Sequence, residues 1–396
     1  MTSAPDRRRL LKLIASAPLA AAPLAHAAPA QAVPRAAPGI VKPLPPGIFT
    51  LRGTNAETDF AALRDTGPLT PADRFFVRNH TSTPVIDERD WTLTVWGSGL
   101  RGRRPVEFGY GQLRSLPSVT RTAVVECAGN GRSLFTAQQG ETVSGTPWTL
   151  GALGAARWRG ARLRDVLDRA GITASAVEVM PRGLDDEFIS GGVNLGRVRR
   201  PLPVAKALDD VILAYEMNGE PLPYDHGFPV RVIVPSWIGI ASVKWLGDIE
   251  VSDTPLVSPW NTQFYRLFGA AHPAGGSAPL TRQTIKSALE LPFGATVAAG
   301  VAMTLTGRAW SAAAPVRTVE ISTDGGEHWR PARLCDTPRR DGWVRWSADW
   351  RPRTTGRVEI LARATDRARG VQPERTVHNT QGYLFDAVVR HPVTVV

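Results

Sequence analysis

A lone cysteine stands where an apolar run gives way to small residues, which suits a thiolate held on a rigid element. Residues 124–132 read VVECAGNGR, so that Cys127 follows the run and Arg132 lies five positions on. The alanine and glycines leave room for a large group beside the sulfur, and Arg132 can lower the thiol pKa or bind an oxyanion. A buried structural cysteine is the alternative, and the motif alone favours neither. A disulfide with Cys335 is not expected, because it would tie two predicted domains together.

Three further groups of polar residues can bind anions or move protons. Residues 75–80 read FFVRNH, and alternation along an extended segment puts Arg78 and His80 on one face, where both can contact one anionic ligand. Basic residues and His226 gather at 225–231 and 242–246, on either side of a predicted strand, and can hold a phosphate. An acidic triplet at 185–187 can form a paired-carboxylate site. Taken one at a time, each group is explained more simply by solvated side chains or, for His226, by a core histidine.

Several classes of protein are excluded by the composition. The 396 residues are 43% hydrophobic and 21% charged, which fits a globular protein with chain enough for two domains. Two cysteines cannot form a four-thiolate metal site, and no C-x-x-C-H run is present, so we expect no haem in this chain. The net charge of +11 comes from arginines interleaved with acids, which favours an anionic small substrate or an acidic protein partner over nucleic acid. No apolar run is long enough for an integral membrane segment.

The N-terminal residues resemble a twin-arginine export signal. Residues 6–12 read DRRRLLK and are followed by a weakly apolar, alanine-rich stretch that ends in the small-x-small sequence AHA at 25–27. We therefore expect a signal peptide at 1–27, a linker rich in alanine and proline at 28–45, and a periplasmic protein exported in its folded form with a cofactor. An ordinary secretory peptide is the alternative.

These residues must be positioned by an α+β domain that is followed by a β-sandwich. Apolar residues at 163, 166, 167 and 170 predict an amphipathic helix that ends at Gly171. Extended runs are predicted at 91–96, 122–126, 228–234 and 243–251. A segment rich in loops at 256–285 contains the domain boundary. Beyond it, strands are predicted at 297–307, 316–323, 343–350 and 358–366, and their spacing without helices indicates an immunoglobulin-like sandwich.

Five segments taken together resemble the sulfite oxidase family of molybdenum enzymes. They are FVRNH (76–80), ECAGN (126–130), AYEMNGEPLP (214–223), DHGFPVR (225–231) and VKWLG (243–247). The resemblance extends from about residue 60 to the C-terminus. It implies a mixed α/β molybdopterin-binding catalytic domain at 46–270 and an immunoglobulin-like dimerisation domain at 280–396.

The resemblance also implies roles for individual residues. Cys127 matches the cysteine whose thiolate ligates molybdenum beside the dithiolene of the pyranopterin, a soft-ligand combination. The catalytic pocket residues implied are Arg78, Cys127, Arg132, Trp148 and Tyr265. The cofactor-binding residues implied are Val77, Arg78, Asn79, His80, Cys127, Asp185, His226, Arg231, Ser242, Val243 and Lys244.

The expected activity is oxidation of sulfite to sulfate, with Arg78 and Arg132 binding the anion. Electrons then pass to an external acceptor such as a c-type cytochrome, and the family implies a homodimer. Gln381 stands where family members carry an arginine, which removes a contact that contributes about 1.5–3 kcal/mol to oxyanion binding. A sulfane dehydrogenase subunit or a sulfoxide reductase on the same scaffold is therefore the first alternative, and a noncatalytic exported binding protein is the second.

Overall fold

The computed structural model describes residues 38–396. The predicted signal peptide and most of the predicted linker lie outside the described residues. Within the described part, no helix combines the length and the apolar character needed to cross a membrane.

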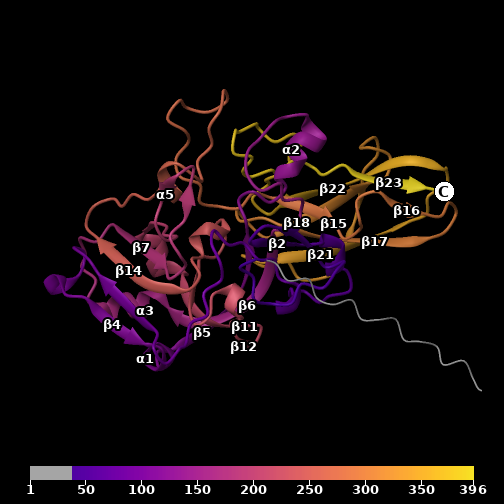
Figure 1. Ribbon diagram of the computed structural model, residues 1–396. Helices are drawn as coiled ribbons and strands as arrows, with labels where there is room; N and C mark the ends of the chain where they lie inside the picture. The colour runs from indigo at the N-terminus through magenta and orange to yellow at the C-terminus, as the bar shows by residue number, and fades with distance from the viewer. Residues whose placement is uncertain (1–37) are drawn as a thin grey trace, which may run out of the picture. The chain divides into compact units, whose positions relative to one another are not determined.

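A five-stranded mixed sheet forms one layer of the N-terminal domain (Figure 1). In spatial order its strands are β10 (Leu202–Pro203), β7 (Glu178–Gly183), β14 (Leu246–Ser252), β3 (Thr92–Trp96) and β4 (Val106–Gly109). The helix α3 (Leu163–Ala170) buries its apolar face in the core that β3 and β14 share, and Gly171 ends it at φ +82°. The sequence pattern predicted this helix, and the prediction is confirmed.

A second five-stranded sheet contains the strand that ends directly before Cys127. Its order is β12 (Glu220–Pro221), β11 (Ile212–Met217), β6 (Leu153–Arg162) and β5 (Ser118–Glu126), and β13 (Arg231–Ile233) pairs with β11. The strands β5 and β6 are antiparallel along the whole length of β5, and the last four residues of β5 are buried. The end of β5, and with it Cys127, is therefore fixed by a long ladder on one side and by the core.

Short elements complete this domain. The strands are β1 (Phe49–Arg52), β2 (Asn55–Thr58), β8 (Ile189–Ser190) and β9 (Val193–Asn194); the helices are α1 (Tyr110–Arg114), α2 (Arg132–Gln139), α4 (Val204–Asp209) and α5 (Pro259–Thr262). Single 3-10 turns occur at Phe60–Leu63, Ala72–Arg74, Arg101–Arg103, Tyr224–His226 and Gly239–Ala241. The helix α2 was not predicted from the sequence. It has only eight residues, between Gly131 and Gly140, which are too few for a periodic pattern to stand out.

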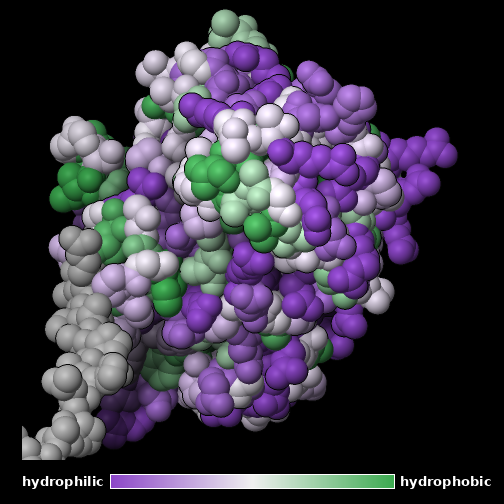
Figure 2. Space-filling model, turned by 90° about the vertical axis from the view of Figure 1, so that its right-hand side faces the viewer, coloured by the Kyte–Doolittle hydropathy of each residue, from purple (hydrophilic) through white to green (hydrophobic). Residues whose placement is uncertain are grey.

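The C-terminal domain is the expected β-sandwich. One sheet has the order β15 (Lys286–Leu289), β17 (Met303–Trp310), β21 (Trp343–Trp350), β20 (Arg333–Leu334). The other has the order β16 (Ala295–Val297), β23 (His391–Val395), β22 (Gly356–Asp366), β18 (Val316–Ser322), β19 (Arg330–Pro331). Their inner faces share one apolar core around Trp346. On the face drawn in Figure 2, apolar residues lie in small groups among hydrophilic ones. The predicted fold class, α+β followed by a sandwich, is confirmed.

Candidate active site

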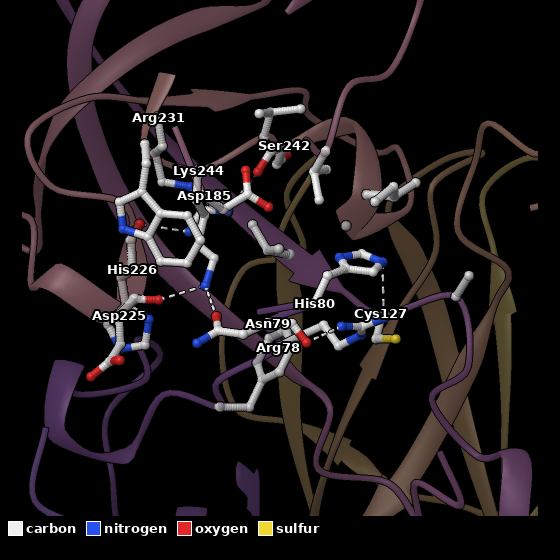
Figure 3. Close-up of a pocket in the computed structure, with 18 of the residues that line it drawn as sticks. Arg78, Asn79, His80, Cys127, Asp185, Asp225, His226, Arg231, Ser242 and Lys244 are labelled. Atoms are coloured by element: carbon white, nitrogen blue, oxygen red, sulfur yellow. Dashed lines mark hydrogen bonds between the residues drawn. The ribbon is translucent and has the colours of Figure 1, made fainter. Parts of the chain in front are cut away.

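A pocket of about 720 Å³, counting the space open to solvent, collects most of the residues that the sequence analysis selected (Figure 3). The predicted residues that line it are Arg78, Asn79, His80, Cys127, Asp185, His226, Arg231, Ser242, Val243, Lys244 and Tyr265. Segments far apart in the sequence thus meet at one place.

Cys127 is held at the pocket by its backbone. Its N–H donates to the Ala152 carbonyl at 2.9 Å, and its carbonyl accepts from the Asn130 N–H at 2.9 Å. A Cβ added at Gly129 would lie 2.5 Å from the Arg132 guanidinium carbon, so the turn after the cysteine needs glycine to let this side chain approach. The thiol is free, as is that of the exposed Cys335. A thiolate on a rigid element is suited to a soft metal.

One end of the pocket carries two buried cations, Arg231 and Lys244, and the carboxylates of Asp225 and Asp185 offset the charge of Lys244 only in part. Arg231 is 4% exposed and donates to the carbonyls of His226 and Ser242, both at 2.9 Å. Lys244 donates to the Asp225 carbonyl at 2.8 Å and to the Asn79 side-chain oxygen. Among residues 38–396, neither cation forms a salt bridge. Burial lowers the pKa of Arg231 to about 9, and desolvation with the charge of Arg231 holds the pKa of Lys244 well below its usual range. An anion bound here would relieve that cost.

Two residues that line the pocket carry polar atoms without hydrogen-bond partners among the described residues. Within the described part of the chain, Oδ1 of Asp185 and Nε of Arg231 are buried and accept or donate no hydrogen bond. Desolvation raises the pKa of Asp185 to about 6 despite the nearby charge of Lys244. Ser242 Oγ accepts from the Val234 N–H at 3.1 Å, which leaves its O–H free to donate. A ligand with a polar edge is needed to satisfy these groups.

His80 joins this part of the pocket to Arg78. Its Nε2 lies 3.1 Å from Nη2 of Arg78 and accepts from the Trp260 indole N–H at 3.1 Å. Because both partners are donors, Nε2 is the unprotonated nitrogen and the ring is neutral. Desolvation, together with the charges of Arg78 and Lys244, holds the pKa of His80 well below its usual range, in agreement with a neutral ring.

Tyr265 enters the pocket from a strained loop and stacks on a second tyrosine. Its backbone has φ +57°, a region that a residue with a side chain seldom adopts. The rings of Tyr265 and Tyr383 lie 5.1 Å apart at 11°, and the guanidinium of Arg132 lies 5.2 Å from the centre of the Tyr383 ring. Burial raises the pKa of both phenols, so both remain protonated and can donate hydrogen bonds at neutral pH.

Three predicted site residues do not line the pocket. Val77 is fully buried, and its backbone N–H and carbonyl both pair with the backbone of Ala56. Arg132 begins α2, and its guanidinium donates to the Gln381 carbonyl at 2.9 Å and to the Thr146 carbonyl at 2.8 Å. Trp148 is fully buried in the apolar cluster that contains Cys127, and its indole N–H has no partner among the described residues.

Two residues at the site were missed by sequence reasoning. Asp225 lines the pocket, and its position directly before His226 in a selected motif was an available signal. Tyr383 belongs to the C-terminal region, more than a hundred residues from Tyr265, and no spacing rule connects the two.

The residues present fit a pyranopterin molybdenum cofactor. Arg231, Lys244 and the neutral His226 would hold its phosphate, while Asp185 and Ser242 offer an acceptor and a donor to the polar edge of a pterin. Cys127 would supply a thiolate to the metal. The orphaned Asp185 oxygen and the buried cations are the observations that support this fit.

Comparison with known proteins agrees with this geometry. Residues 80–260 match the family model of the oxidoreductase molybdopterin binding domain, and residues 286–395 match that of the Mo-co oxidoreductase dimerisation domain. The crystal structure of the sulfane dehydrogenase SoxCD from Paracoccus pantotrophus is similar with a TM-score of 0.71 at 26% identity, over 84% of this chain and 82% of that one.

Relatives of known name are similar over most of this chain. It is 36% identical to the sulfite oxidase of Gallus gallus over 342 residues, which are 81% of this chain and 72% of the relative. It is 35% identical to the mitochondrial sulfite oxidase of Drosophila melanogaster over 372 residues, which are 87% of this chain and 62% of the relative. The chain thus spans less than two thirds of the Drosophila enzyme. On these matches and this site, the protein belongs to the sulfite oxidase family of molybdenum oxidoreductases.

Proposed function

We propose that this protein oxidises sulfite to sulfate and passes the electrons to an external acceptor. The observation that carries the proposal is that Arg78, Cys127 and Tyr265 line the same pocket as the buried cations of the cofactor site. In balance, sulfite and one water give sulfate, two protons and two electrons. The molybdenum group, when bound, supplies the two-electron redox chemistry.

The protein residues bind and orient the anion in this proposal. Arg78 carries a permanent charge at the pocket wall, and its guanidinium contacts only the Asn79 carbonyl and the His80 ring in the described structure. A sulfite oxygen can therefore bind to it by a charge-assisted hydrogen bond. Tyr265, protonated because burial raises its pKa, can donate a second hydrogen bond to the same anion. Arg132 has two of its N–H groups engaged by carbonyls and contributes mainly long-range charge.

A sulfane dehydrogenase is the second candidate, for two reasons. A similar solved structure is that of a sulfane dehydrogenase. The side-chain amide of Gln381, in place of a family arginine, donates to the Gln263 carbonyl at 3.0 Å, and its buried side-chain oxygen Oε1 has no partner among residues 38–396. Glutamine in place of arginine removes one positive charge, which suits a substrate with less negative charge than sulfite.

Steady-state kinetics distinguish the two candidates. The holoenzyme is assayed with sulfite, with a thiol-bound sulfane and with a sulfoxide, using ferricyanide or a c-type cytochrome for the two oxidations and a reduced dye for the sulfoxide. We expect kcat/KM for sulfite to exceed that for the sulfane by about 100-fold or more. A preference for the sulfane, or turnover of the sulfoxide alone, would reject the proposal.

The partners and the location are proposed with it. A c-type cytochrome is proposed as the acceptor, because the printed sequence has no haem-attachment motif. A homodimer is supported by the match of residues 286–395 to the dimerisation domain.

Export to the periplasm by the twin-arginine route is supported by residues 6–27 of the sequence. Fractionation of cells that express the full chain, with and without its two arginines at positions 7 and 8, tests the last point.

A further inference from the structure

Residues 39–44, at the end of the predicted linker, are bound to the outside of the pocket wall. The N–H groups of Val41 and Lys42 donate to the Asp225 carboxylate at 3.1 and 2.7 Å. The Gly39 carbonyl accepts from the Thr83 N–H at 2.9 Å. Leu44 is 1% exposed and packs on Ala56 and Val77. The segment is thus fixed at its start, its middle and its end.

The same segment contacts two chain segments that both line the cofactor site and also touch each other, since the rings of Phe75 and His226 lie 5.3 Å apart. One wall is 75–80, which carries Arg78, and the other is the turn that carries Asp225 and His226. The backbone at 41–42 binds Asp225. The Lys42 ammonium donates to the Phe75 carbonyl, at the start of the first wall, and to the carbonyls of Ala72 (3.3 Å) and Asp73 (3.4 Å) just before it. One short piece of chain therefore bonds to both walls.

Asp225 transmits this contact directly to the cofactor residues. Its carboxylate faces the segment and accepts from the Thr83 hydroxyl at 2.5 Å, while its backbone carbonyl accepts from Lys244 at 2.8 Å. The Thr83 hydroxyl in turn accepts from the Asn79 amide at 2.9 Å, and Asn79 also contacts Lys244. Movement of the segment would shift the groups that hold the phosphate.

Close approach makes this arrangement specific. A Cβ on Gly39 would lie 2.9 Å from the Ser82 Cα, and Gly39 has φ +72°, so a larger residue could not dock here without moving the backbone. The buried Asp225 and Thr83 would lose partners if the segment left, which makes its departure costly.

We propose that residues 39–44 form a clasp that ties the two walls of the cofactor pocket together and so retains the cofactor, with Lys42 and Thr83 as its positioning residues. Separation of the two walls would break the bonds of the clasp, so we expect the clasp to slow the release of the cofactor. The inference depends on the proposed function only in that the pocket holds this cofactor.

Release of molybdenum from the loaded protein tests the clasp without any substrate. The holoprotein is placed in buffer with a molybdate-trapping resin, and protein-bound molybdenum is followed with time. We expect Lys42→Met and Thr83→Val to release molybdenum about 10- to 100-fold faster than the wild type. The matched control is Lys206→Met, which removes a partly buried ammonium that bonds to Asp210 and Pro235 outside the pocket. Equal release by the wild type and both clasp variants would overturn the proposal.

Hydrogen exchange in the unmodified protein keeps the proposal testable if a variant does not fold. We expect the N–H groups of Val41 and Lys42 to exchange more slowly in the loaded protein than in the cofactor-free protein. Equal exchange in the two forms would overturn the clasp. A protein that shows the expected release and exchange but does not oxidise sulfite would refute the proposed substrate and leave the clasp standing.

Discussion

Removing the Lys286 ammonium is expected to destabilise the protein far more than removing a surface charge. Lys286, on β15 of the sandwich, donates to Glu126 Oε1 at 2.7 Å and to the Asn130 carbonyl at 3.1 Å. Both side chains are buried, with 6% and 3% exposed. Glu126 directly precedes Cys127 and also accepts from the Trp310 indole at 3.0 Å. The pair therefore connects the second domain to the cysteine turn.

The magnitude follows from what Lys286→Met leaves behind. The Glu126 carboxylate keeps two neutral donors, Trp310 and the Asn130 amide, but loses its counter-charge in the core. Breaking a buried ion pair in this way costs about 3–5 kcal/mol. Because the double variant Lys286→Met/Glu126→Gln removes both charges, we expect it to cost less than the sum of the two single variants by about 1–3 kcal/mol.

Urea unfolding, followed by fluorescence and circular dichroism, measures these free energies. The matched control is Arg390→Met, which removes the half-exposed partner of Glu359 and should cost less than about 1 kcal/mol. If Lys286→Met lowers the free energy of unfolding no more than this control does, the buried pair does not stabilise the protein. If the effects of the two single variants simply add in the double variant, Lys286 and Glu126 are not coupled.

Three other predictions concern the pocket. Asp185→Asn should stabilise the cofactor-free protein near pH 7 by about 3 kcal/mol, since burial raises the Asp185 pKa from 3.8 to about 6. This gain in the free energy of unfolding should shrink as pH falls through 6 and vanish below 4. Urea unfolding at several pH values measures it. Arg78→Gln should raise KM for sulfite by roughly 10- to 150-fold and change kcat less. If steady-state kinetics show a large fall in kcat with little change in KM, Arg78 does not bind the substrate. Tyr383→Leu should raise the same KM by roughly 2- to 30-fold through loss of the Arg132 contact, while Tyr383→Phe, which keeps the ring, should stay near wild type.

Local patterns in the sequence predicted the elements that a single segment determines. The helix at 163–170 follows from its apolar spacing and from Gly171, and the strands at 316–322, 343–350 and 356–366 follow from runs between turn signals. The pocket residues from Arg78 to Lys244 were found because whole motifs resembled those of a family.

The contacts between distant segments could not be predicted in this way. Tyr383 reaches Tyr265 because the connection between β22 and β23 returns to the first domain, as the hydrogen bond from the Leu384 N–H to the Ala128 carbonyl shows. Composition at 28–45 indicates a linker, yet residues 39–44 dock on Asp225, whose burial no local pattern reveals. Arg132 was expected at the substrate, but carbonyls of two loops bind its guanidinium.

The most direct test of sulfite oxidation at the Cys127 pocket is an anaerobic titration of the purified, molybdenum-loaded protein with sulfite. Metal content and the paramagnetic signal of molybdenum are followed together with ferricyanide reduction, in the wild type and in Cys127→Ser. We expect about one molybdenum per chain, reduced by sulfite with one sulfate formed per two electrons, and loss of this reduction in Cys127→Ser. Molybdenum that sulfite does not reduce, or a Cys127→Ser protein that is reduced as readily as the wild type, would contradict this expectation.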